Sequence, residues 1–421
     1  MGEARTKALL ARQAARVLAT VGSTERNRAL RAMAVSLRTA CADICAANAA
    51  DVAEARSAGT SEPLIDRLLL TEQRVEAMAA GLEGVAAQPD PLGRVLSGSQ
   101  LPNGLQVQKV TVPLGVVAMV YEARPNVTSD AAGLCLKAGN AALLRGGSMA
   151  VQSCRAIVEA LRNALEEVGL PRDAVCLLET PGHRVVDELF GLVGLVDLLV
   201  PRGGAGLIRA CVENAKVPVV ETGTGNCHVY VERTADVAMA ASIIANAKCS
   251  RPSVCNACES VLVDEGLLER DPQALAELLR PLVEAGVVIY GDERTCAVVA
   301  ALGGGAQPAT DEDWGREYLA LALSCKVVSG TAEAIAHVNR YGTGHSECIV
   351  TGSYDASEAF LAQVDAAAVY VNASTRFTDG EMFGLGAEIG ISTQKLHARG
   401  PMGAEALVTT KYLCRGAGQV R

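Results

Sequence analysis

Aromatic side chains are scarce in this sequence: only 3% of the residues are aromatic, and there is a single tryptophan. A core of large stacked rings is therefore excluded, and we expect the interior to be built from Ala, Val, Leu and Ile at close backbone spacing. Half of the residues are hydrophobic and a fifth are charged, which is typical of a folded, soluble protein. Because 421 residues exceed what one hydrophobic core usually supports, two or three structural units are predicted.

Excess positive charge and long apolar runs are also missing. The formal net charge of −9 argues against nucleic acid or an anionic membrane as the main partner, so an anionic substrate would have to be held by local Arg and Lys. Apolar stretches such as 116–121 are far too short to span a bilayer. The first residues alternate charged and apolar positions and do not form a secretory signal. We therefore expect a cytoplasmic protein.

Cysteine, by contrast, is abundant, with fourteen residues scattered from Cys41 to Cys414. Disulfide scaffolds occur in small secreted chains, so most of these cysteines are predicted to be small buried hydrophobes in a reducing compartment. Cys255 and Cys258 form one Cys-x-x-Cys pair. A single pair with no nearby histidine does not indicate a metal site, and we expect none. A redox disulfide is the more serious alternative.

The order of apolar and turn-forming residues predicts an α/β protein. The first ninety residues have helical spacing, and 91–113 reads as an extended hairpin that is either an oligomerisation element or a surface ribbon. From residue 113 onward, short apolar strands alternate with helices. The strands are expected at 115–121, 141–144, 174–178, 196–200 and 217–220, and a second block of strands and helices begins near 234. This alternation indicates parallel sheets covered on both faces, which bind ligands at the carboxyl ends of their strands.

Two residues at such positions are candidates for the chemistry. Cys255 follows a helix and a proline turn and precedes a strand, so its thiol lies on a short loop where it can be exposed. The alternative is a buried core cysteine. Glu221 ends a predicted strand and is followed closely by Gly223, which is a suitable place for a general base or a cofactor contact. The alternative is a carboxylate that accepts hydrogen bonds from the turn.

Four further loops carry candidate binding residues. Gly203 and Gly204 precede a helix and would let a pyrophosphate approach its N-terminus, although simple turn chemistry explains them equally well. Arg145 and Ser148 follow another strand and could accept a ribose 2′-phosphate. Each of the two remaining loops carries an arginine, whose guanidinium can bind a carboxylate through two hydrogen bonds. One loop contributes Arg124 and Asn126, and the other contributes Asn372, Ser374 and Arg376. A surface arginine in a local ion pair is the alternative.

Together these stretches resemble a known family. Segments 120–127, 136–140, 144–148, 251–256, 372–377, 383–388 and 397–401 are similar, in the same order, to those of the gamma-glutamyl phosphate reductases of the aldehyde dehydrogenase superfamily. The resemblance extends over about residues 8–415. It implies an aldehyde dehydrogenase-like fold with two Rossmann-like parallel-sheet domains and a small oligomerisation element. The implied divisions are a nucleotide-binding domain at 1–232, a catalytic domain at 233–390 and a returning segment at 391–421.

The resemblance also implies a reaction, the NADPH-dependent reduction of L-glutamate 5-phosphate to L-glutamate 5-semialdehyde, the second step of proline biosynthesis. Cys255 falls on the catalytic cysteine of the family, and Asn126 is the expected side-chain amide of the oxyanion site. The implied cofactor residues are Arg145, Ser148, Gly203, Gly204, Glu221 and Gly223, and the implied substrate residues are Arg124, Asn372, Ser374 and Arg376. A homo-oligomer is expected, and a separate glutamate kinase would supply the substrate. The alternatives are a CoA-acylating or hydrolytic aldehyde dehydrogenase, or a redox scaffold with a Cys255–Cys258 disulfide.

Overall fold

The structure is a computed structural model that describes residues 2–122 and 124–421, and it divides into two compact units. Unit 1 comprises Met1–Thr222, Gly384–Gly390 and Leu396–Arg421, and unit 2 comprises Gly223–Phe383 and Ile391–Lys395. The first boundary thus falls ten residues before the predicted position (232 − 222 = 10), because β7 (Cys227–Val231) pairs with strands of unit 2. Residues 384–390, which were predicted to belong to the catalytic domain, lie in unit 1.

The central sheet of unit 1 is parallel and has the strand order β5-β4-β3-β6. Its strands are β3 (Val116–Tyr121), β4 (Ala141–Arg145), β5 (Val175–Leu177) and β6 (Leu198–Arg202). They are almost wholly buried, as expected for continuous apolar strands in a sheet that is covered on both faces. The strand predicted at 217–220 was wrong, because this segment contributes only a single bridge between Val219 and Leu199.

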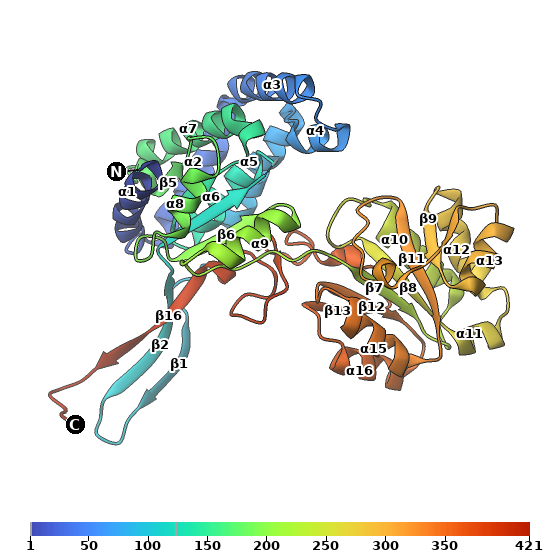
Figure 1. The fold of residues 1–421 in the computed structure, drawn as a ribbon. Helices are drawn as coiled ribbons and strands as arrows, with labels where there is room; N and C mark the ends of the chain where they lie inside the picture. Colours follow the sequence, from blue (N-terminus) through green and yellow to red (C-terminus); the bar gives the residue numbers. More distant parts are fainter. Residues whose placement is uncertain (1, 123) are drawn as a thin grey trace. The chain divides into compact units, whose positions relative to one another are not determined.

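Helices pack around this sheet (Figure 1). Their buried side chains, mainly Ala, Leu and Val, fill the core. The helices are α1 (Glu3–Leu18), α2 (Ser23–Thr39), α3 (Cys41–Ser57), α4 (Glu62–Leu68), α5 (Glu72–Ala87), α6 (Val127–Lys137), α7 (Val151–Glu167), α8 (Arg184–Phe190) and α9 (Ala205–Asn214). Shorter elements are η1 (Ser148–Ala150), η2 (Arg172–Ala174), β15 (Gly400–Pro401) and η4 (Ala404–Leu407). Small alanine side chains let α1 pack closely, since Ala4, Ala8 and Ala11 recur on one helical face and are fully buried.

A three-stranded antiparallel ribbon extends from the helices and sheet of unit 1 (Figure 1). The hairpin predicted at 91–113 is present as β1 (Val95–Gln100) and β2 (Gln106–Pro113). The third strand, β16 (Val408–Arg415), pairs with β2 along its whole length. Several apolar side chains of this ribbon are exposed, among them Val95, Leu96 and Tyr412.

Unit 2 is built on a seven-stranded parallel sheet of order β10-β9-β11-β8-β7-β12-β13. Its further strands are β8 (Cys258–Asp264), β9 (Val288–Gly291), β10 (Ala306–Pro308), β11 (Ala322–Val328), β12 (Ser346–Val350) and β13 (Ala368–Val371), with the short β14 (Ile391–Ser392) apart from the sheet. The helices are α10 (Val237–Cys249), α11 (Glu265–Arg270), α12 (Ala274–Glu284), α13 (Glu293–Ala301), α14 (Asp311–Trp314), α15 (Thr331–Tyr341), α16 (Tyr354–Gln363) and η3 (Thr375–Phe377).

Two separate cores cover the two faces of this sheet. Along β7, Val229 and Val231 belong to one core, whereas Tyr230 between them belongs to the other. This alternation follows from the two-residue period of a strand.

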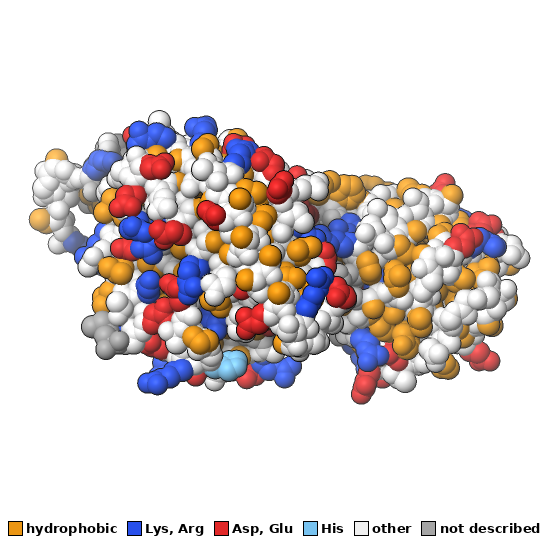
Figure 2. Space-filling view, turned by 90° about the horizontal axis from the view of Figure 1, so that it is seen from above, with side chains coloured by type: hydrophobic (Ala, Val, Ile, Leu, Met, Phe, Trp, Pro, Cys, Tyr) orange, Lys and Arg blue, Asp and Glu red, His pale blue; other side chains and the backbone are white. Residues whose placement is uncertain are grey.

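The surface drawn in Figure 2 carries basic and acidic side chains interspersed, and neither sign forms a broad patch on that face. Among residues 2–122 and 124–421, no helix has the length and apolar character needed to cross a membrane.

Candidate active site

Cys255 lies on the segment that joins α10 to β8, and its side chain is partly exposed. The next residue anchors this segment from one side. The Asn256 side-chain amide donates to the carbonyl oxygen of Thr378 at 2.8 Å, and the Asn256 carbonyl accepts a hydrogen bond from the Thr375 hydroxyl at 2.7 Å. Residues 375–378 therefore hold the backbone next to the thiol.

The backbone of Cys255 is held from the other side by the start of β7. A Cβ atom on Gly225 would overlap the Cys255 carbonyl oxygen, so only glycine fits there. The Cys227 thiol donates to the same carbonyl oxygen at 3.2 Å. Burial raises the pKa of Cys227 well above its ordinary value. Cys227 is thus a protonated donor that helps to fix Cys255, not a second nucleophile.

The other member of the Cys-x-x-Cys pair has a different environment. Cys258 is fully buried in β8, and its thiol donates to the Ser260 carbonyl oxygen at 3.3 Å. Burial raises the pKa of Cys258, which keeps the thiol neutral. No disulfide links cysteines within the described part of the chain.

The predicted substrate loop lies against the cysteine segment within unit 2. The Arg376 guanidinium donates to the side-chain oxygen of Asn256 and, through Nε, to the Ser250 hydroxyl at 3.3 Å. Burial lowers the pKa of Arg376, and the nearby Arg251 lowers it further. A cation therefore contacts the residue that follows Cys255 in the chain.

The side chains of two other predicted substrate residues form hydrogen bonds with backbone groups. Ser374 accepts a hydrogen bond from the Arg376 N–H at 3.3 Å, which caps η3. Asn372 has a positive φ of 56°. Its amide accepts from the Thr351 N–H and donates to the Thr351 carbonyl, each at 2.9 Å. Both residues shape the loop that presents Arg376.

In unit 1 the predicted cofactor residues lie at the carboxyl ends of β4 and β6. Arg145 ends β4 and donates to the carbonyl oxygens of Gly146 and Gly182, while its buried Nε has no hydrogen-bond partner among the described residues. Ser148 is exposed at the start of η1. A guanidinium and an exposed hydroxyl at one strand end are groups that can bind a phosphate of a nicotinamide dinucleotide.

The N-terminus of α9 already binds an anion from the chain itself. The Gly204 N–H donates to a carboxylate oxygen of Glu122 at 2.9 Å, and a Cβ on Gly203 would come within 2.6 Å of the Glu122 carboxyl carbon. Glu122 follows β3 directly, but its role was not apparent from the sequence, because only the fold brings the ends of β3 and β6 together. A pyrophosphate at Gly203 and Gly204 would have to displace this carboxylate.

Arg124 and Asn126 follow β3 in unit 1, and Ala123 just before them lies outside the described residues. Asn126 is the N-cap residue of α6, and its amide donates to a carboxylate oxygen of Asp130 at 3.0 Å. Burial raises the pKa of Asp130 to about 7. Asp130 is a further residue that the sequence did not single out.

Two predicted residues lie next to the boundary between the units. Glu221 is partly buried and belongs to unit 1, whereas Gly223 belongs to unit 2. The Gly223 N–H donates to the Ile391 carbonyl oxygen at 3.1 Å, and a Cβ at this glycine would overlap Thr393.

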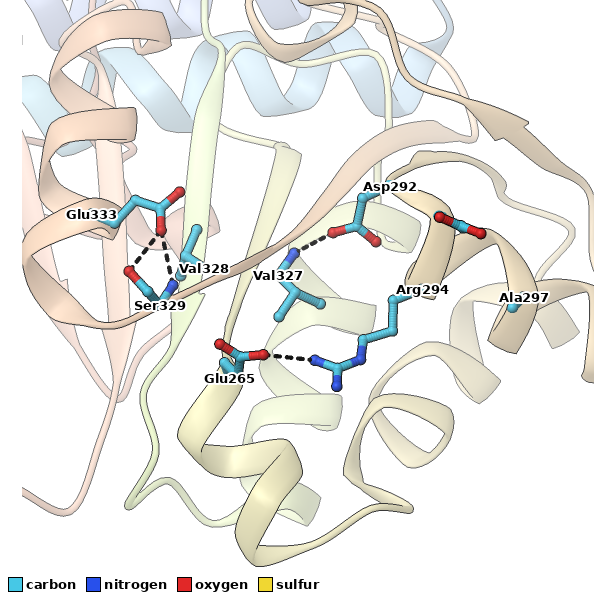
Figure 3. A pocket seen from close by; sticks show the side chains of 9 residues that line it. Glu265, Asp292, Arg294, Ala297, Val327, Val328, Ser329 and Glu333 are labelled. Carbon is cyan, nitrogen blue, oxygen red and sulfur yellow. Dashed lines mark hydrogen bonds and ion pairs between the residues drawn. The ribbon is translucent and has the colours of Figure 1, made fainter.

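An open pocket of about 560 Å³ lies at the carboxyl ends of β8, β9 and β11 in unit 2 (Figure 3). It contains none of the predicted site residues. Two of its carboxylates are already engaged: Asp292 accepts from the Val327 N–H at 2.7 Å, and Glu265 pairs with Arg294 at 3.3 Å. In the described part of the chain, no group of three or more His, Cys, Asp or Glu side chains could hold a metal ion.

Comparison with known proteins defines the class first. A family model described as "Aldehyde dehydrogenase family" matches residues 3–289, and the chain belongs to this family. A solved aldehyde dehydrogenase of the acetylating type, from Geobacillus thermoglucosidasius, shares the fold at 19% sequence identity and a TM-score of 0.72, covering 100% of this chain and 97% of that one. Enzymes of the family are oxidoreductases that use nicotinamide cofactors.

The particular branch follows from proteins that are similar over the whole length. The gamma-glutamyl phosphate reductase of Moorella thermoacetica is 54% identical over 419 residues, which cover 100% of this chain and 99% of that protein. The enzyme of the same name from Clostridium beijerinckii is 52% identical over 421 residues, with both chains fully covered. The crystal structure of the Thermotoga maritima gamma-glutamyl phosphate reductase matches with a TM-score of 0.95 at 44% identity, covering all of both chains. The predicted fold class and the predicted family are therefore confirmed.

Proposed function

We propose that this enzyme reduces L-glutamate 5-phosphate to L-glutamate 5-semialdehyde and phosphate through a thioester on Cys255. The observation that carries the proposal is the Cys255 segment, whose backbone is fixed by Gly225, Cys227 and Asn256 while the thiol stays partly exposed. The names of the full-length relatives supply the substrate class.

In the first step, the Cys255 thiolate attacks the acyl carbon, a carbon–sulfur bond forms, and the bond to the phosphate oxygen breaks. The guanidinium of Arg376, close to Cys255 within unit 2, favours the thiolate and an anionic substrate. We propose that the Cys255 N–H and the Asn126 amide stabilise the tetrahedral oxyanion. Splitting the reduction into two steps is the benefit of covalent catalysis.

A bound nicotinamide cofactor supplies the hydride that reduces the thioester. We propose that Arg145 and Ser148 bind the 2′-phosphate of NADPH, because they combine a guanidinium and an exposed hydroxyl at one strand end. Glu221, Gly203, Gly204 and Gly223 are proposed to line the cofactor site. Arg124 and the loop that contains Asn372, Ser374 and Arg376 are proposed to bind the α-carboxylate of the substrate.

The test is NADP⁺ reduction by the purified enzyme with glutamate 5-semialdehyde, with and without inorganic phosphate. Phosphate-dependent turnover that disappears in Cys255→Ala would support the proposal. Turnover that ignores phosphate would mean that water accepts the acyl group, and turnover that requires coenzyme A would mean a CoA-acylating enzyme. Either result would overturn it.

We further propose that the ribbon of β1, β2 and β16 is an assembly element of a homo-oligomer, because Val95, Leu96 and Tyr412 expose apolar surface there. We also propose that a glutamate kinase supplies the acyl phosphate. Light scattering of the wild type and of Leu96→Asp would test the first point: a change to smaller species supports it, and an unchanged mass contradicts it.

A further inference from the structure

A fully buried ion pair joins the two elements that flank the Cys255 segment. Lys248 lies in the last turn of α10 and Glu259 lies near the start of β8, and neither side chain is exposed. Their charged atoms are 2.5 Å apart. Burial raises the pKa of Glu259 to about 7, and the Lys248 ammonium opposes this rise. Because two buried charges lose their hydration, apolar residues of similar volume would stabilise the fold at least as well.

The ion pair is linked to the far side of the same segment. The second carboxylate oxygen of Glu259 accepts a hydrogen bond from the Leu319 N–H at 3.2 Å. Leu319 has a positive φ of 53°, a conformation that costs free energy in a branched residue. Glu317, two positions earlier, accepts a hydrogen bond from the Gly225 N–H at 2.7 Å. Gly225 in turn packs directly on the Cys255 carbonyl oxygen.

These contacts form a continuous chain that connects α10 with the backbone of Cys255. It runs from α10 through Lys248 and Glu259 to the loop at 317–319, and from Glu317 through Gly225 to Cys255. We infer that Lys248, Glu259 and Glu317 are positioning residues that hold the Cys255 thiol toward the acyl carbon and its backbone N–H toward the acyl oxygen. The inference rests on the proposed function of Cys255. A misplacement of about 1 Å at a reacting group can lower the rate roughly a hundredfold.

Glu317 offers the cleaner test, because it is only partly buried and its replacement should not prevent folding. Glu317→Ala removes the acceptor of the Gly225 N–H, whereas Glu317→Gln keeps a carbonyl oxygen in the same place. We expect the alanine variant to lose about 10- to 100-fold in kcat with KM nearly unchanged, and the glutamine variant to stay close to wild type. Full activity in Glu317→Ala, or an equal loss in both variants, would overturn the inference.

The ion pair is tested by Lys248→Met/Glu259→Met, with a partly exposed Lys–Glu pair of unit 2 as a matched control, Lys326→Met/Glu333→Met. We expect the buried variant to keep its melting temperature within a few degrees but to lose about tenfold or more in kcat, and the control to keep its kcat. Unchanged kcat in the buried variant would show that the pair serves only the fold. If that variant does not fold, the two Glu317 variants decide.

A second readout separates this inference from the proposed function. Acylation of Cys255 by p-nitrophenyl acetate, followed by peptide mass mapping, requires neither the acyl phosphate nor NADPH. If the wild type fails to oxidise the semialdehyde, the proposed function fails. A slower acylation of Cys255 in Glu317→Ala than in Glu317→Gln would still support the positioning role, and equal rates would contradict it.

Discussion

Replacing Asp130 by asparagine is expected to stabilise unit 1, and to do so more strongly at pH 8 than at pH 5. Asp130 lies on α6, and its surroundings contain Asn126, Arg202 and Glu388. Burial raises the pKa of this carboxyl from 3.8 to about 7, although the Asn126 amide and the Arg202 guanidinium oppose the rise. The ionised form is therefore the one that the folded protein disfavours.

The magnitude follows from the two pKa values. The folded pKa is raised, so between pH 3.8 and pH 7 the native state binds more protons than the unfolded state, and stability falls as the pH rises. A shift of about three units at about 1.4 kcal/mol each gives a loss of about 4 kcal/mol above pH 7. More than half of this loss falls between pH 5 and pH 8. The asparagine side chain of the variant does not titrate, so the variant should not show this part of the pH dependence.

The assay is urea unfolding of wild type and Asp130→Asn at pH 5, 6, 7 and 8, followed by far-UV circular dichroism. The only tryptophan, Trp314, lies in unit 2, so its fluorescence reports separately on the unit that the change does not touch. The difference in unfolding free energy should widen by roughly 2 to 3 kcal/mol from pH 5 to pH 8 in the transition of unit 1. A difference that is the same at both pH values would refute the reasoning.

Three further predictions concern other contacts. Glu122→Gln removes the carboxylate from the N-terminus of α9, so NADPH should bind up to about fivefold more tightly in a fluorescence titration, and weaker binding would mean that Glu122 contacts the cofactor. Gly225→Ala should lower Cys255 acylation about a hundredfold, because the added Cβ displaces the Cys255 carbonyl, whereas Gly305→Ala, whose Cβ has room, should acylate normally. Lys137→Met should lower the unfolding free energy of unit 1 by about 2 to 3 kcal/mol. The reason is that Nζ donates to the Asn27 side chain and to the Ala86 and Gln88 carbonyl oxygens. An effect no larger than that of the control Lys411→Met, at an exposed lysine, would contradict this role.

The local sequence predicted elements that carry their own apolar run or turn signal. Continuous apolar runs identified β3, β4 and β6, and the turn at 102–104 identified the hairpin of β1 and β2. The third ribbon strand could not be predicted, because its contacts join residues such as Gln108 and Arg415, which are 307 positions apart. Distant pairing of this kind leaves no local periodicity.

The candidate site shows the same limit. Cys255 and Arg376 were identified from their loops and from the family resemblance, and the fold brings their segments together through Asn256. Glu122, Gly225 and Cys227 were not identified, because each acts through a contact with another strand end or with the backbone of Cys255. Glycine and cysteine at such positions look like ordinary turn and core residues until their neighbours are known.

The discontinuity of unit 1 bears on how the chain folds during synthesis. Residues 223–383, most of unit 2, leave the ribosome as one uninterrupted stretch. The core of unit 1 also needs Met402 and Leu407, and the buried Asn140 amide donates to the Leu407 carbonyl oxygen at 2.8 Å. The first 222 residues therefore cannot complete their core, and part of their apolar surface stays uncovered, until the C-terminal residues leave the ribosome. Unit 2 is expected to complete its fold first, and the N-terminal part is the stretch most in need of chaperone protection.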